Sequence, residues 1–122
     1  MNAPRCMLAE AIGTFFLCFA GIGAILSTQA PINSGAGLVG IALAHGLALS
    51  IGVNAFGGIS GAHFNPAVTI GMLVTGRIKL DGAIQYILAQ LVGACVAAWA
   101  CQSLWPAEAV ASASLGIPLP NP

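Results

Sequence analysis

The sequence predicts an all-α membrane protein with three membrane-spanning helices and one shorter helix that enters the membrane and returns. Of its 122 residues, 58% are hydrophobic and 5% are charged, and the mean hydropathy is +0.96. Soluble domains carry about 25% charged residues, so this chain cannot supply a soluble surface. Three apolar stretches reach the roughly 20 residues needed to cross a bilayer, and a fourth is too short to do so.

Charge and side-chain chemistry exclude several classes of function. Three basic residues balance three acidic ones, and the absence of a basic cluster argues against a nucleic-acid-binding protein. The sequence has no nucleophile paired with a base, no paired carboxylates and no phosphate-binding loop, so we expect no enzyme. The four cysteines lie in apolar runs without metal-ligand spacing. We therefore expect them to be small buried hydrophobic side chains, with no metal and no cofactor.

The first predicted span interrupts its apolar run only with Glu10 and Thr14, and the second has His45 and Asn54 as its only strongly polar side chains. Residues 28–36 contain Pro and Gly and predict a loop. The predicted spans cover about residues 7–27, 37–56 and 80–104. Residues 1–105 then form the membrane domain, and residues 106–122, rich in Ala, Ser and Pro, predict an extramembrane tail with no core of its own.

The segment between the second and third spans, residues 57–75, is the most informative. Residues 57–66 hold three glycines and a proline but no charge, so they cannot form a continuous helix. Asn65 as N-cap and Pro66 as first residue predict a short helix that ends near Val74. Such a helix rises about 15 Å, half the hydrocarbon thickness, so it must enter and return.

A re-entrant segment implies an aqueous path. Irregular backbone at membrane depth is tolerated only where protein buries it or where it lines a water-filled cavity. The alternative is an interfacial helix that lies flat on the membrane, which also suits about ten residues. The absence of charge before Pro66 favours re-entry.

Basic residues predict the orientation of the chain. Arg5 precedes the first span, and Arg77 and Lys79 precede the third, so two crossings separate them and all three lie on one side. The positive-inside rule makes that side cytoplasmic and the tail external.

Small residues recur every fourth position in two spans and predict close helix packing. They are Gly40, Ala44, Ala48 and Gly52 in the second span, and Ala89, Gly93 and Ala97 in the third.

Three stretches carry a family resemblance. The string SGAHFNPAVT at residues 60–69 resembles the first signature loop of the aquaporin and glycerol-facilitator (major intrinsic protein) superfamily, whose hallmark is Asn-Pro-Ala. The string AEAIGTF at residues 9–15 is similar to the start of the family's first helix, and YILAQLVGA at residues 86–94 to that of its third.

The resemblance implies half of a family fold. Family members have two inverted repeats, each with three membrane helices and one half-helix, and the two Asn-Pro-Ala half-helices meet at the bilayer centre. This chain resembles the first repeat only, because it has no second Asn-Pro-Ala and no Arg after that motif. Residues 106–112 are similar to the connector between repeats, so we expect the chain to stop where a second half would begin.

The resemblance also assigns candidate sites. Asn65, Pro66 and Ala67 form the motif, in which Asn65 caps the half-helix and donates its amide to passing water, while the helix dipole repels cations and protons. The backbone carbonyls of Gly61, Ala62 and His63 would face the pore. For the His63 ring, hydrogen bonding that pins the loop and direct pore contact both stay open.

Three further side chains are candidates. Glu10 would anchor the loop through backbone N–H groups, and Gln90 would have a comparable supporting role. His45 matches a position that helps line the constriction near the outer mouth of the pore in relatives. The alternative for His45 is a packing histidine with satisfied hydrogen bonds.

The leading hypothesis is a passive channel half for water or small neutral solutes in the cell membrane. Three helices and a half-helix cannot enclose a pore, so a complementary half or further copies are expected, with the tetramer implied by the family. An antiparallel homodimer is disfavoured because the basic residues lie on one side. The alternative is a non-conducting truncated chain or a structural subunit that associates with intact channels.

Overall fold

The computed structural model describes residues 3–29, 35 and 37–117, and within them it is all-helical. The helices are α1 (Ala3–Thr28), α2 (Gly37–Ser60), α3 (Pro66–Val74), α4 (Leu80–Leu104) and α5 (Ala107–Ala113), followed by a 3-10 turn (Ser114–Gly116). Three of them, α1, α2 and α4, are long and apolar enough to cross a membrane. The predicted fold class is confirmed: this is an all-α chain with three candidate spans and a half-length helix between the second and third.

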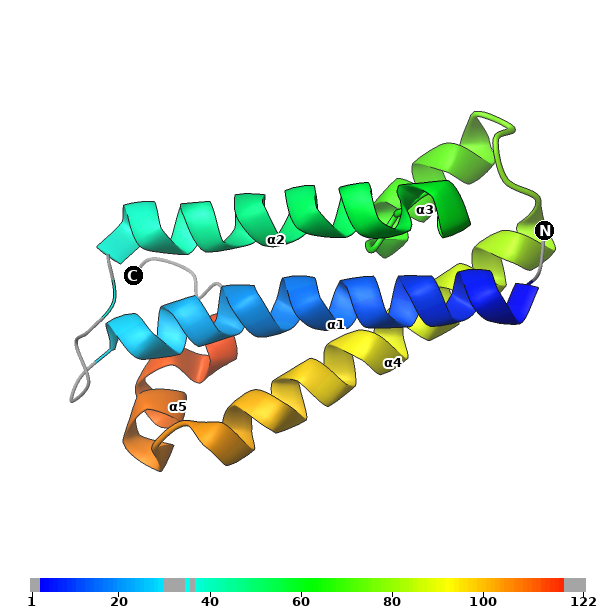
Figure 1. Cartoon of the computed structure of the whole chain (residues 1–122). Coiled ribbons are helices and arrows are strands. Elements are labelled where there is room, and N and C mark those ends of the chain that lie inside the picture. Colours follow the sequence, from blue (N-terminus) through cyan, green and yellow to red (C-terminus); the bar gives the residue numbers. More distant parts are fainter. Residues whose placement is uncertain (1–2, 30–34, 36, 118–122) are drawn as a thin grey trace.

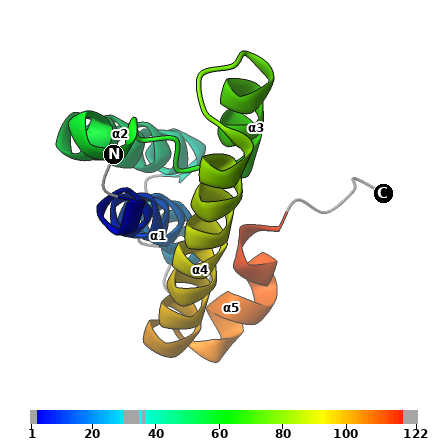
Figure 2. The same cartoon turned by 90° about the vertical axis from the view of Figure 1, so that its right-hand side faces the viewer.

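The helix α1 lies in the middle of the bundle, with α2 on one side and α4 on the other (Figures 1 and 2). The chain reaches the far end of α2, folds back into the bundle over residues 61–65, and returns along α3 to the end where α4 begins (Figure 1). The short helix therefore enters and leaves the bundle at one end. The same end holds the first turn of α1, which brings Arg5, Arg77 and Lys79 to one end of the molecule.

Small residues decide how closely the long helices approach. Gly93 of α4 is buried, and a side chain there would collide with the backbone carbonyl of Ala11 and reach the backbone nitrogen of Phe15 on α1. Ala89 and Ala97 are buried on the same face, so the predicted α4 stripe is a helix interface. The α2 stripe packs less tightly: Ala44, Ala48 and Gly52 line a groove of about 540 Å³ between α1 and α2.

The structure differs from the prediction at the end of the second span. The helix α2 continues to Ser60 instead of ending near Phe56, so the predicted end of the second span was too early. Residues 57–66 still form no continuous helix, as expected, because the helix breaks at residues 61–65. Two bonds from other helices hold this last turn despite its glycines: the Tyr86 hydroxyl donates to the Ser60 carbonyl oxygen at 2.8 Å, and the Ser60 hydroxyl donates to Glu10 at 2.6 Å. Tertiary hydrogen bonds have here overridden helix propensity.

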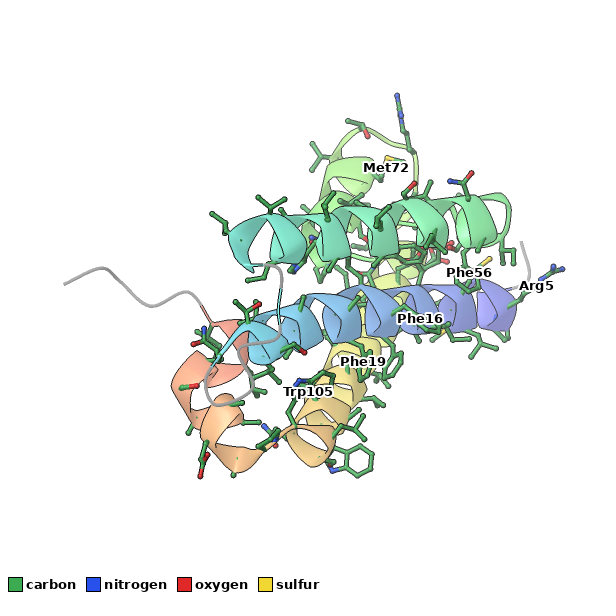
Figure 3. The ribbon with its side chains drawn as sticks, turned by 60° about the vertical axis from the view of Figure 1, so that its left-hand side comes forward. Arg5, Phe16, Phe19, Phe56, Met72 and Trp105 are labelled. Atoms are coloured by element: carbon green, nitrogen blue, oxygen red, sulfur yellow. The ribbon has the colours of Figure 1, made fainter. Side chains whose placement is uncertain are left out.

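The structure shows how the tail packs, and it places two of the four cysteines differently from the prediction. The tail forms α5, whose Ala109 is fully buried, and the preceding Trp105 packs edge-on against Phe19 of α1 (Figure 3). Residues 118–122 of the predicted tail and residues 30–34 and 36 of the predicted loop lie outside the described residues.

Cys6 and Cys101 are buried as expected, but Cys18 is only partly buried and Cys95 is exposed, because its face of α4 has no neighbour among the described residues.

Candidate functional site

The loop of residues 61–65 reverses the chain between α2 and α3 with an unusual backbone. Gly61, Ala62 and Phe64 all have positive φ angles, of 88°, 51° and 49°. For the two non-glycine residues this left-handed conformation costs on the order of 1 kcal/mol or more each, so the surroundings must hold it. Asn65 then returns to extended backbone, and its side-chain oxygen accepts a hydrogen bond from the Ala67 N–H at 2.8 Å. Asn65 thus caps α3, with Pro66 as its first residue.

Glu10 of α1 holds this loop. Its Oε1 accepts hydrogen bonds from the Ser60 hydroxyl at 2.6 Å and the His63 N–H at 2.9 Å. Its Oε2 accepts from the Phe64 N–H at 2.7 Å and from Nε2 of Gln90 at 2.8 Å. The residue is 0% exposed, and four donors match the four positions at which a carboxylate accepts hydrogen bonds. Hydrogen bonds, with no basic partner among the described residues, stabilise this buried acid.

Thr69 links the other side of the loop to α4. Its hydroxyl donates to the Asn65 carbonyl oxygen at 3.2 Å and accepts from Nε2 of Gln90 at 3.0 Å. Nδ1 of His63 lies 3.1 Å from the same hydroxyl oxygen, whose only hydrogen is already donated. Nδ1 therefore carries the ring hydrogen, by this count of donors and acceptors. The buried ring of His63 also packs edge-on against Tyr86, with ring centroids 5.2 Å apart.

Phe64 anchors the loop to the first two spans. It is 2% exposed, and a side chain at either Gly13 of α1 or Gly52 of α2 would collide with its ring. The two glycines therefore leave the space in which Phe64 inserts between α1 and α2. Phe56 packs edge-on against the same ring, with centroids 6.1 Å apart. The loop is thus fixed by polar contacts on the α4 side and by an aromatic ring on the α2 side.

His45 lies apart from this network, on α2. Its Nδ1 donates to the Ile41 carbonyl oxygen at 2.8 Å, one turn back in the same helix. The opposite edge of the ring lies against Gly21 of α1, where a Cβ would come within 2.7 Å of Cε1. The side chain as a whole is exposed. One ring nitrogen is therefore satisfied within α2, and the absence of a side chain at Gly21 gives the ring its space.

Comparison with known proteins adds to this geometry. The family model described as Major intrinsic protein matches residues 1–118. The chain belongs to the major intrinsic protein family. The resemblance seen in the sequence is confirmed, and the helices and loop described above are those of a partial member of that family.

Named relatives of this major intrinsic protein cover most of the chain. The glycerol uptake facilitator protein-like 6 of Lactiplantibacillus plantarum is 44% identical over 112 residues, which are 92% of this chain and 49% of the relative. Aquaporin Z of Photorhabdus laumondii is 45% identical over 94 residues, 77% of this chain and 41% of the relative. The probable aquaporin TIP2-1 of Oryza sativa is 44% identical over 100 residues, 79% of this chain and 40% of the relative. The chain spans less than half the length of these relatives.

The structure brings most of the predicted site residues of this family member together. Gly61, Ala62 and His63 lie in the loop beside Asn65, Pro66 and Ala67, and the buried Glu10 and Gln90 bond to that loop or its neighbours. His45 is not part of this cluster. The roles of all these residues in conduction stay predictions.

Sequence reasoning did not single out Phe64, which lies in the loop itself. It also missed Ser60, Thr69 and Tyr86, each of which contacts a loop residue. Two signals could have found some of them. Thr69 lies four positions after Asn65, so both are on one face of the short helix. Gly13 and Gly52 are glycines within apolar helices, and such a glycine usually has a packing reason, here the close approach of a large side chain. The structure identifies that side chain as Phe64.

Proposed function

We propose that this chain is one half of a passive transmembrane channel for water or small neutral solutes. The observation that carries the proposal is the short helix α3, which starts inside the bundle at Asn65 and returns to the end from which it came. In a membrane such a segment requires an aqueous path or burial in protein. The relatives named as aquaporins and as a glycerol uptake facilitator support the same class of permeant.

Asn65 would be the main group that meets the permeant. Its side-chain oxygen is used by the cap of α3, and its Nδ2 has no partner among the described residues, so both amide hydrogens are free to donate. The N-terminus of α3 adds about half a positive charge beside them. Together they would bind the oxygen of a neutral solute and repel cations and protons. Carbonyl oxygens of Gly61, Ala62 and His63 would supply the acceptors.

The remaining candidates support or narrow this path. Glu10 and Gln90 would hold the loop without touching the permeant, since both are buried in the hydrogen-bond network. His45 would line the outer constriction, with its exposed side chain offering a polar surface. By the positive-inside rule, the end with Arg5 and Arg77 is cytoplasmic and the tail is external.

A complementary half would complete the channel. The helix α2 has only Gly52 and Ser60 buried, and α3 only Thr69, and most of the apolar side chains of both helices are exposed. Relatives about twice as long as this chain contain the additional sequence that could provide it. Assembly into a tetramer would follow the family. Residues 1–105 would form the half-channel and residues 106–122 its external connector.

Osmotic swelling of proteoliposomes tests this proposal. The chain alone should give lipid-background water permeability, and co-reconstitution with the C-terminal half of the Lactiplantibacillus relative should raise it. Asn65→Ala should reduce the permeability of that assembly, while Asn54→Ala, an exposed asparagine whose amide bonds within α2, should leave it unchanged. A stable assembly of both halves without permeability would favour the non-conducting structural subunit instead.

A further inference from the structure

A hollow of about 490 Å³ opens at the end of the bundle where α1 and α4 begin. Its walls are the first turns of these two helices and the connection between α3 and α4. Ala3, Cys6 and Ile78 contribute apolar surface, and Gln85 contributes a polar side chain. The loop network described above does not use this hollow, apart from the buried Tyr86 at its inner edge.

Two of the three basic residues of the chain line the hollow. Arg77 and Lys79 are exposed, and neither forms an ion pair or side-chain hydrogen bond with the described residues. Asp81 is the one acidic residue in the lining, so the site has a net charge of +1 from side chains. Lys79, the N-cap of α4, makes no side-chain cap hydrogen bond, so N–H groups at this helix end, beside the hollow, have no side-chain partner. The hollow therefore favours an anion.

Position and neighbouring surface restrict the anion further. The hollow lies just before Leu80, where the third candidate span begins, and therefore at the level of lipid headgroups. Leu80, Ile84 and Leu88 follow on one face of α4 and are 63%, 50% and 56% exposed. An apolar strip thus leads from the rim of the charged hollow into the membrane. A ligand that matches both parts has an anionic head and a long apolar chain.

We propose that this hollow binds the headgroup of an anionic phospholipid, with the phosphate between Arg77 and Lys79 and an acyl chain along Leu80, Ile84 and Leu88. Basic pockets at helix ends are a general mode of lipid-headgroup recognition. The Asp81 carboxylate opposes the phosphate and sets an upper limit on the affinity. This binding does not depend on conduction, so it holds whether or not the chain is a channel half.

Electron paramagnetic resonance of spin-labelled lipids tests the proposal on the full chain in phosphatidylcholine bilayers. Spin-labelled phosphatidylglycerol should associate with the chain more strongly than spin-labelled phosphatidylcholine, by about five-fold per basic residue. The double variant R77Q/K79Q should bring the two lipids to equal association. Asp81→Asn should strengthen phosphatidylglycerol association, because it removes the opposing charge without adding bulk.

Arg5→Gln is the matched control. It removes a basic charge at the same end of the bundle, but Arg5 does not line the hollow and projects away from α1 (Figure 3). It should leave the preference for phosphatidylglycerol unchanged. An equal loss per charge removed in Arg5→Gln and in R77Q/K79Q would overturn the specific site in favour of general surface charge. Displacement of the spin-labelled lipid by inorganic phosphate would contradict lipid binding and indicate that the hollow binds a free anion. All variants change exposed side chains, and circular dichroism checks their helix content.

Discussion

The Glu10 carboxylate connects α1 to the last residue of α2, to the loop before α3 and to α4. A buried acid without a cation is costly, and the donors around it are equally costly to leave unpaired. The loop residues with positive φ angles add strain that these bonds must hold. At the scale of residues, the re-entrant loop therefore depends on one side chain at a distance of more than 50 positions in the sequence.

Replacing Glu10 by glutamine should destabilise the chain by about 3 kcal/mol, because the amide nitrogen would face a donor and one acceptor position would be lost. Titration of the chain in micelles with sodium dodecyl sulfate, followed by circular dichroism, measures this free energy of unfolding. Glu108→Gln is the control, since Glu108 is exposed on α5. Equal stability of the two variants would contradict the anchoring role of Glu10.

At the scale of elements, the parallel pair α1 and α4 is the most closely packed part of the bundle. Both helices have buried faces, whereas α2 and α3 keep most of their side chains exposed. Within lipid, close contact of small residues replaces the hydrophobic effect as the source of helix association. The pair can approach closely because Gly93 and Ala97 present little more than backbone to α1.

Gly93→Ala should destabilise the chain by about 1–3 kcal/mol, because the added methyl group meets the Ala11 carbonyl and forces the helices apart. Gly46→Ala on α2 is the matched change, since a Cβ there has nothing within 4 Å. That variant should be as stable as the unaltered chain or slightly more so. The same unfolding titration compares the two. A loss of stability in Gly46→Ala but not in Gly93→Ala would reverse this account of the interface.

At the scale of the whole molecule, the three candidate spans put the two ends of the described chain at opposite ends of the bundle. Basic residues gather at one end, and α5 with its single acidic residue lies at the other. This asymmetry is what a fixed orientation in the membrane requires.

Labelling with a membrane-impermeant maleimide checks that orientation in cells, in a background whose four cysteines are replaced by alanine. Arg5→Cys and Lys79→Cys should react only after the membrane is permeabilised, which lets the reagent reach the cytoplasmic side. Glu108→Cys should react from outside. Reaction of Arg5→Cys and Lys79→Cys from different sides would contradict the three-span arrangement. If these two variants reacted from outside and Glu108→Cys only after permeabilisation, the result would contradict the orientation alone.

The sequence alone determined the class, the number of spans and the short helix with its cap. These follow from hydropathy and from the local chemistry of Asn65 and Pro66, which need no knowledge of distant residues. The short helix ends at Val74 and α4 spans Leu80–Leu104, as hydropathy along the chain predicts.

Only the tertiary structure decided how the loop is held. Ser60, Thr69 and Tyr86 are unremarkable in sequence and acquire partners only when α1, α2, α3 and α4 meet. Phe64 finds its place because two glycines from different spans face it. The last turn of α2 is helical for the same reason, since bonds from α1 and α4 outweigh its glycines. Local composition sets which secondary structure each segment can form, but long-range hydrogen bonds and packing decide where each side chain lies.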